Sequence, residues 1–271
     1  MCRTNRLRID AQKTRASQLN RSADDEDMKL DTIVDFLNGI LKVKAHGEDS
    51  GLKLTGRTKI CKIGGAVDLS LYAINQASQA RCDFLFTHHD AWSSTDAELA
   101  EKKSELLRRR KISTYVAHDP LDLHSELGTA FSLARALNWH ISDSFMNNLG
   151  VIAEVNNVTS LEESISHISA TLGNKTYVVP AGGKIDRVGI IAGWGARPEW
   201  MSEARAKGAT TFLSGEAIHF GKLYAKESGM NLILAGHYAT ELPAVKVLLD
   251  CIGKEFNIET ELIKDEISAE L

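Results

Sequence analysis

Five side chains that could hold metal ions follow short apolar runs of the sequence. His88 and His89 stand side by side after the run at 83–87, Asp122 follows the run at 113–117, and His237 and Glu241 follow the run at 231–235. Each run has the length and composition of a buried strand. Because ligands of open α/β sheets bind at the carboxyl ends of the strands, we expect these side chains to meet at one cleft.

The residue types indicate two metal ions rather than one. Neighbouring side chains tend to diverge, so His88 and His89 suit two ions that lie close together, one for each imidazole. Glu241 lies one helical turn after His237 and is the natural carboxylate to bridge both ions. Imidazoles and carboxylates without a thiolate fit zinc, iron, manganese, cobalt or nickel better than a structural zinc, which prefers cysteine.

Each signal also has an ordinary structural interpretation. Adjacent histidines can simply lie in a surface turn. Thr240 can cap a helix at which Glu241 is favourable to the dipole, and Asp122 can cap a helix that begins near Ser125. The metal interpretation is preferred because all five side chains follow strands, in halves of the chain that mirror each other.

Three further polar residues are expected near the ligands. His118, His124 and Glu216 could orient the imidazoles or relay protons, and we assign catalytic roles to His118 and Glu216 together with Glu241. Arg197 could reach an anionic substrate or lie on the surface. Trp92 could form a wall of the cleft or pack in the core.

The segment Gly193-Trp194-Gly195 resembles half of a dinucleotide-binding fingerprint. Pro198 occupies the position of the third glycine, so we do not expect a nucleotide loop of that kind.

Strands alternate with helices along the chain, which is typical of an α/β fold with a mostly parallel sheet. The segments TYVAHDPLD and LILAGHYATE both place a histidine after a strand and a carboxylate four residues later. This similarity predicts two pseudo-repeated α/β lobes that face one cleft. We expect a disordered extension over 1–27 (or a true start at Met28), a first lobe over 28–150, a bridge over 151–187 and a second lobe over 188–271.

Composition limits the possible partners and compartment. The net charge of −4 gives no electrostatic reason to expect nucleic-acid binding. Four scattered cysteines without a CxxC pair indicate reduced thiols, and no run approaches the length of a membrane span. The N-terminus lacks the apolar region of a secretory signal, so we expect a cytoplasmic protein.

Four ordered motifs resemble one known family. FTHHDAW, AHDPLDLHSELG, FLSGEAIH and AGHYATE are similar to the motifs of the GTP cyclohydrolase 1 type 2 homologues, also called the Ngg-one-interacting-factor-three-like family. The resemblance implies a two-lobed subunit with a dinuclear metal centre, assembled into a toroidal homohexamer. Carried over by motif, it pairs His88 with His237 and His89 with Asp122, with Glu241 bridging the two ions. Asp90 and the segment AGWGARPEW depart from the family pattern and leave the substrate open.

Two functions are compatible with such a site. A metal-dependent hydrolase would use two bridged ions to lower the pKa of water and to polarise the bond under attack, on a nucleotide, a cyclic amide or a phosphoester. A carrier, metal-insertion factor or regulatory adaptor would bind the metals without catalysis. The lack of an evident substrate-recognition motif favours the second, and family membership alone does not decide the chemistry. Between the two we slightly prefer the hydrolase.

Overall fold

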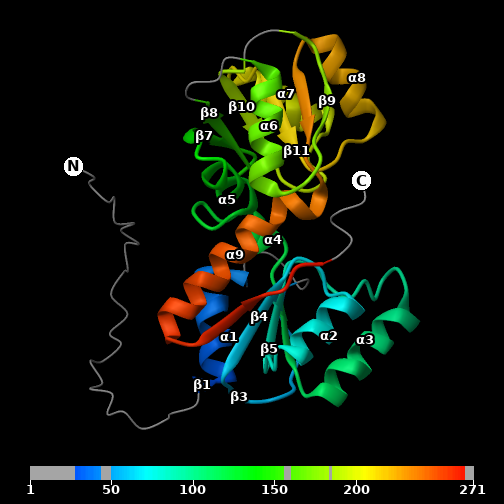
Figure 1. Ribbon diagram of the computed structural model, residues 1–271, viewed down its shortest axis with the longest axis vertical. Helices are drawn as coiled ribbons and strands as arrows, with labels where there is room; N and C mark the ends of the chain where they lie inside the picture. Colours follow the sequence, from blue (N-terminus) through cyan, green and yellow to red (C-terminus); the bar gives the residue numbers. More distant parts are fainter. Residues whose placement is uncertain (1–27, 44–49, 156–159, 183–184, 266–271) are drawn as a thin grey trace, which may run out of the picture.

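Two β-sheets covered by helices make up the computed structural model, which describes residues 28–43, 50–155, 160–182 and 185–265. The extension predicted over 1–27 lies outside these residues. Figure 1 shows the sheets one above the other, with helix α9 (His237–Phe256) running from one to the other. The predicted α/β fold is confirmed.

The first sheet has five strands and is mostly parallel, as predicted. Its order is β13 (Glu259–Leu262), β4 (Lys62–Ala66), β5 (Phe84–Thr87), β6 (Ser113–Val116) and β2 (Gly51–Leu54), of which only β2 runs antiparallel to its neighbour. A separate pair joins β1 (Met28–Lys29) to β3 (Lys59–Ile60).

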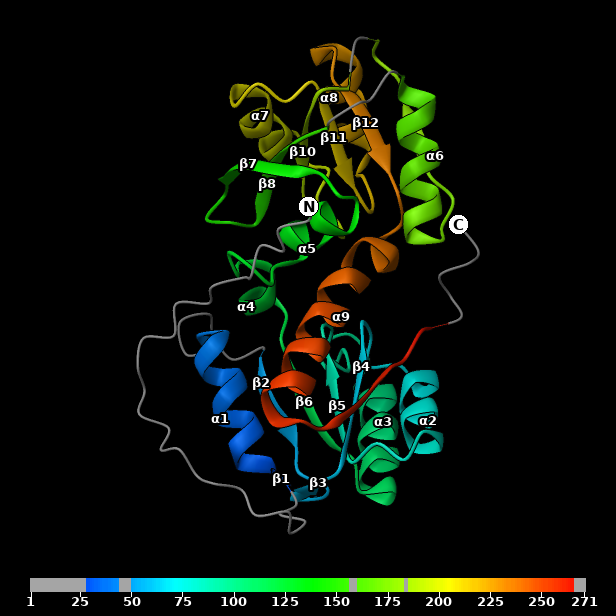
Figure 2. The ribbon, with the colours of Figure 1, turned by 60° about the vertical axis from the view of Figure 1, so that its left-hand side comes forward.

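Helices cover both faces of this sheet. Helices α1 (Leu30–Ile40) and α9 lie on one face, and α2 (Leu71–Gln79) and α3 (Ala97–Arg110) lie on the other (Figure 2). The side chains of β5 alternate accordingly: Phe84 and Phe86 belong to the core under α1 and α9, whereas Leu85 packs with α2 and α3. A strand that is buried on both faces is apolar along its length, which is why β5 is easily recognised in the sequence.

The second sheet has six strands and is mixed. Its order is β7 (His140–Phe145), β8 (Gly150–Glu154), β10 (Arg187–Ile190), β11 (Thr211–Ser214), β12 (Asn231–Leu234) and β9 (Tyr177–Val179). The strands β10, β11 and β12 are parallel, and the flanking strands are antiparallel. Helices α5 (Thr129–Ala136) and α6 (Leu161–Leu172) pack on one face, and α7 (Pro198–Ala206) and α8 (His219–Ser228) on the other.

The sheets group the chain differently from the predicted segments. Strand β7 falls in the predicted first lobe, β8 begins at its last residue and continues into the predicted bridge, and β9 falls in the bridge, yet all three belong to the six-stranded sheet. Conversely, α9 and β13 fall in the predicted second lobe but join the five-stranded sheet. The physical reason is long-range pairing: β13 runs parallel to β4, and α9 buries Val245 and Leu248 against that sheet.

The chain crosses between the sheets in two places. Residues 117–128 lead from β6 through the short helix α4 (Asp119–Asp122) to α5, and residues 235–236 lead from β12 to α9. Both crossings follow the carboxyl ends of strands; the first carries His118, Asp122 and His124, and the second leads directly into the first turns of α9, which carry His237 and Glu241. None of the described helices has the length and apolar character that crossing a membrane requires.

Candidate metal centre

The five predicted metal ligands converge around the carboxylate of Glu241. His88 and His89 directly follow β5, Asp122 ends α4, and His237 and Glu241 lie in the first turns of α9. The Glu241 carboxylate is 3.1 Å from Nε2 of His237, 3.4 Å from Nε2 of His89 and 3.7 Å from Nε2 of His88. Asp122 Oδ1 lies 3.7 Å from Nε2 of His88.

The distances can be compared with the pairing that the resemblance implies. Asp122 lies beside His88, and His237 forms a compact set with His89 and Glu241, whose ligand atoms all lie within 4.8 Å of one another. The resemblance had paired His237 with His88 and Asp122 with His89. The bridging carboxylate agrees with the resemblance, because Oε1 of Glu241 lies near both His237 and His88 and Oε2 lies near His89. The position of Asp122 beside His88 departs from it.

Each imidazole turns its Nδ1 away from Glu241 toward a fixed partner. Nδ1 of His88 is 2.9 Å from the Ala117 carbonyl, Nδ1 of His89 is 2.8 Å from Asp68 Oδ1, and Nδ1 of His237 is 3.5 Å from Glu216 Oε2. A carbonyl oxygen can only accept, so Nδ1 of His88 donates the hydrogen and Nε2 keeps its lone pair. Partners of this kind orient imidazoles in metal sites.

Two buried acceptor atoms in the cluster have no hydrogen-bond donor. These are Nε2 of His88, whose side chain is fully buried, and Oε2 of Glu241. Leaving a buried polar atom unsatisfied costs about 1–3 kcal/mol. A lone pair and a carboxylate oxygen cannot satisfy each other, whereas a cation between them would satisfy both. The donor set present therefore fits a metal ion.

Charge in the cluster is arranged to keep Glu241 ionised. Burial alone would raise its pKa, but the nearby imidazoles of His88, His237 and His89 outweigh this effect and lower it to about 2. Burial lowers the pKa of His88, which favours the neutral imidazole that a metal requires. Burial also acts to lower the pKa of His237, but Glu241 and Glu216 outweigh it and raise this pKa to about 9.

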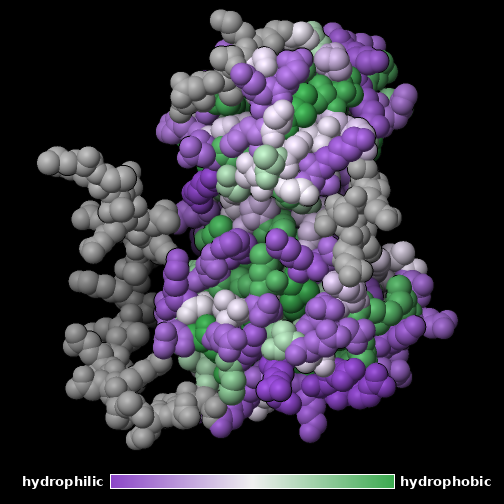
Figure 3. Space-filling model, in the orientation of Figure 1, coloured by the Kyte–Doolittle hydropathy of each residue, from purple (hydrophilic) through white to green (hydrophobic). Residues whose placement is uncertain are grey.

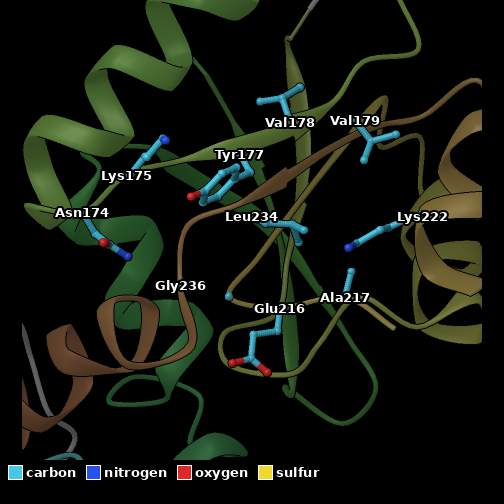
Figure 4. A pocket seen from close by; sticks show the side chains of 11 residues that line it. Asn174, Lys175, Tyr177, Val178, Val179, Glu216, Ala217, Lys222, Leu234 and Gly236 are labelled. Atoms are coloured by element: carbon cyan, nitrogen blue, oxygen red, sulfur yellow. The ribbon is translucent and has the colours of Figure 1, made fainter. Parts of the chain in front are cut away.

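The predicted catalytic residues take different places. The ring of His118 stacks on His88 with centroids 4.8 Å apart, lies in the same cavity as the ligands, and has its Nδ1 2.7 Å from Asp119. Glu216 instead lies behind His237, at the edge of a second cavity of about 560 Å³. Figure 4 shows the Glu216 carboxylate pointing away from Lys222 and Tyr177, which also line this second cavity. Of its two predicted roles, the geometry favours orienting His237.

Several alternatives from the sequence are now decided by contacts. His124 accepts hydrogen bonds from the amides of residues 126 and 127, so it stabilises a turn. Thr240 lies inside α9 and does not cap it, because its hydroxyl accepts from Gly193 N and donates to the His237 carbonyl. Trp92 is half-exposed beneath the ammonium of Lys103.

Sequence reasoning missed two residues that fix the ligands. Asp68 holds His89, and the Thr129 hydroxyl donates to Asp122 Oδ1 at 2.6 Å. Asp68 follows the end of β4 just as His88 follows β5, so its position at the carboxyl edge of the sheet was the signal that could have identified it.

Gly193 allows the Glu241 carboxylate to approach the backbone. Its φ is +59°, and a Cβ built there would collide with Oε1 of Glu241 and lie 3.1 Å from Nε2 of His237. Gly229 has a similar φ of +70° but no atom within 4 Å of such a Cβ.

These two glycines give a matched test of the close contact. We expect Gly193→Ala to lower the free energy of unfolding by about 1–3 kcal/mol more than Gly229→Ala, because only the first adds crowding to backbone strain. Urea unfolding of both variants measures the difference. Equal losses would show that the approach of Glu241 to residue 193 is not a constraint.

The contact between Asp68 and His89 gives a second prediction. We expect Asp68→Asn and Asp68→Ala to weaken zinc binding by about 10–100-fold, because the imidazole loses the carboxylate that orients it and raises its basicity. Competition with a chromophoric chelator measures the affinity. Asp143→Asn, at a surface pair with Lys207, is the control. An unchanged affinity in both Asp68 variants would contradict the role of this carboxylate.

Comparison with known proteins agrees with this fold. The family model of Duf34/NIF3 (NGG1p interacting factor 3) matches residues 28–268 of the sequence. A Deinococcus radiodurans protein named GTP cyclohydrolase 1 type 2 homolog is 32% identical over 244 residues, which cover 86% of this chain and 92% of that protein.

Solved structures share the architecture. Reduced HcgD from Methanocaldococcus jannaschii is 25% identical with a TM-score of 0.76, covering 89% of this chain and 100% of that one. A protein named ybgI, of unknown function, is 24% identical with a TM-score of 0.82 over 89% and 100% of the two chains, which shows a common fold. Since the family model spans most of the sequence, this chain belongs to the Duf34/NIF3 family.

Proposed function

We propose that this chain binds two divalent metal ions and acts as a metal-dependent hydrolase. The observation that carries the proposal is the pair of buried acceptors, Nε2 of His88 and Oε2 of Glu241, that no hydrogen-bond donor satisfies. They lie among three imidazoles and a second carboxylate, Asp122, which together form the donor set that such ions prefer.

The ligands divide between two ions. As the resemblance implies, His88 and His237 would hold one ion and His89 and Asp122 the other, with Glu241 bridging them; the approach of Oε1 of Glu241 to His237 and His88 and of Oε2 to His89 supports this division. Without a thiolate, this set is compatible with zinc, iron, manganese, cobalt or nickel.

The residues around the ligands supply binding and proton transfer. When bound, two divalent ions provide Lewis acidity and make hydroxide available near neutral pH. His118 lines the cavity with its Nδ1 engaged by Asp119, so its Nε2 is free to carry a proton to a leaving group. Relatives carry the name GTP cyclohydrolase 1 type 2 homolog, and a nucleotide, a cyclic amide or a phosphoester would suit this chemistry.

Removal of Glu241 tests the proposal. We expect Glu241→Ala to lose most of its bound metal and all metal-dependent turnover, because both ions share this carboxylate. Elemental analysis of metal-loaded, dialysed protein and a hydrolysis screen over the three substrate classes measure both effects. Glu255→Ala, which removes an exposed carboxylate from the same helix, should behave as the wild type. Unchanged metal content in Glu241→Ala would overturn the metal site.

A non-catalytic carrier, metal-insertion factor or adaptor is the competing proposal. It is favoured by the shortage of proton donors: among the described residues that line the cavity, His118 is the one histidine outside the five ligands. A metal-replete protein that hydrolyses none of the three substrate classes but transfers its metal to a partner would support this alternative.

Assembly into a homohexamer and a cytoplasmic location remain parts of this proposal. Phe220 and Leu223 lie three residues apart on α8, and both are exposed, as is Tyr177 on β9. Figure 3 shows apolar surface in the region of β9 and α8. An exposed apolar area of this kind favours contact with another subunit.

Sedimentation tests the assembly. We expect the wild type to sediment as a hexamer at micromolar concentration and Phe220→Glu to shift toward smaller species, because a buried carboxylate would have no partner at the interface. Lys226→Glu, on the same helix, is the control for charge alone. A monomeric wild type would rule out the ring.

A further inference from the structure

Arg197 places a cation in the wall of the metal cavity. It lies between β10 and α7, and its side chain lines the same cavity of about 340 Å³ as His89, Asp122 and Glu241. Arg197 is not one of the five metal ligands. Its side chain does not cap α7, the helix that follows it, so neither function explains its position.

Two tryptophan rings lie against the guanidinium of Arg197. Its central carbon lies 4.1 Å from the ring centroid of Trp194 and 4.9 Å from that of Trp200. Stacking on aromatic rings orients a planar guanidinium and limits its motion. The arginine is therefore presented in a defined direction.

The guanidinium retains unused hydrogen-bond donors. Its Nε is buried without an acceptor, and within residues 28–43, 50–155, 160–182 and 185–265 no carboxylate forms an ion pair with it. Guanidinium has five N–H donors in a fork that matches the oxygens of a carboxylate or a phosphate. A partly buried guanidinium that has no ion-pair partner among the described residues and lines a ligand-sized cavity has the chemistry to bind an anion.

Hydrogen bonds hold the loop that carries these residues. Gly193 N donates to Thr240 Oγ1 at 2.9 Å, Gly195 N donates to Ser214 Oγ at 3.0 Å, and Glu216 N donates to the Gly193 carbonyl at 2.8 Å. These bonds tie the loop to α9 and to the end of β11. Arg197 is thus held by the elements that hold the metal ligands.

We infer that the substrate is a small anionic molecule whose carboxylate or phosphate oxygens bind Arg197 while its reacting group lies at the metal ligands. This inference rests on the proposed function. The cavity volume suits a small molecule. Asp122 and Glu241 would repel an anion by themselves, so the anion binds tightly only when metal ions neutralise these carboxylates.

Calorimetric titration of the zinc-loaded protein with methylphosphonate and with acetate tests the inference and separates the two kinds of anion. We expect Arg197→Gln to weaken binding of the preferred anion by about tenfold or more, and Arg197→Lys to give a smaller loss, because lysine keeps the charge but not the fork. Zinc content should stay at the wild-type level in both variants. The neighbouring tryptophan fluorescence should change on anion binding, and less so in Trp194→Phe.

Arg187→Gln is the matched control. Arg187 begins β10, pairs with Glu154 and does not line the cavity, so its loss should leave anion affinity unchanged. If the wild type binds neither anion, or if Arg197→Gln binds both as tightly as the wild type, the inference is overturned. If binding depends on Arg197 but no substrate class is hydrolysed, the anion site stands and the hydrolase proposal fails.

Discussion

The buried carboxylate of Glu241 is the interaction on which the site depends. Only 5% of this residue is exposed, and an ionised carboxylate at such a position is costly unless cations or hydrogen-bond donors surround it. Three imidazoles approach it from two elements, β5 and α9, and Gly193 gives it room from a third. Because no single element supplies this environment, the carboxylate requires both sheets to be in place.

Helix α9 connects this requirement to the fold. Its first turns carry His237 and Glu241 beside the six-stranded sheet, and its later turns bury Val245 and Leu248 against the five-stranded sheet. The same helix therefore positions ligands and anchors them in a hydrophobic core. A rigid helix places a metal ligand more accurately than a loop does. His88 and His89, which approach Glu241 from the five-stranded sheet, are likewise positioned by a regular element because they directly follow β5.

The sequence was informative where local pattern determines structure, and less so where distant segments decide it. The apolar runs before His88 and His237 predicted strands, and their carboxyl ends predicted the cluster. Asp68 was missed because Gly64 and Gly65 look like the end of a strand, although β4 continues through them to Ala66. The strand tolerates Gly65 because Leu249 of α9 occupies the space that a side chain would need, at 3.1 Å from where a Cβ would lie. The pairing of β13 with β4 joins segments that are far apart in the sequence. No local pattern predicts it, so it was missed as well.

The orientation of the two adjacent histidines could not be read from motif order either. In a regular strand, the side chains of His88 and His89 would point to opposite faces. Here the strand has ended, and both amides donate to the same carbonyl, that of Val67, so the two rings lie only 4.7 Å apart and both face Glu241. Which ring then lies nearer to Asp122 depends on the local turn of the backbone. His88 donates to the carbonyl of Ala117, the first residue of the crossing segment that carries Asp122, whereas Nδ1 of His89 lies beside Asp68. The outer hydrogen bonds of the two histidines therefore orient both rings around Glu241.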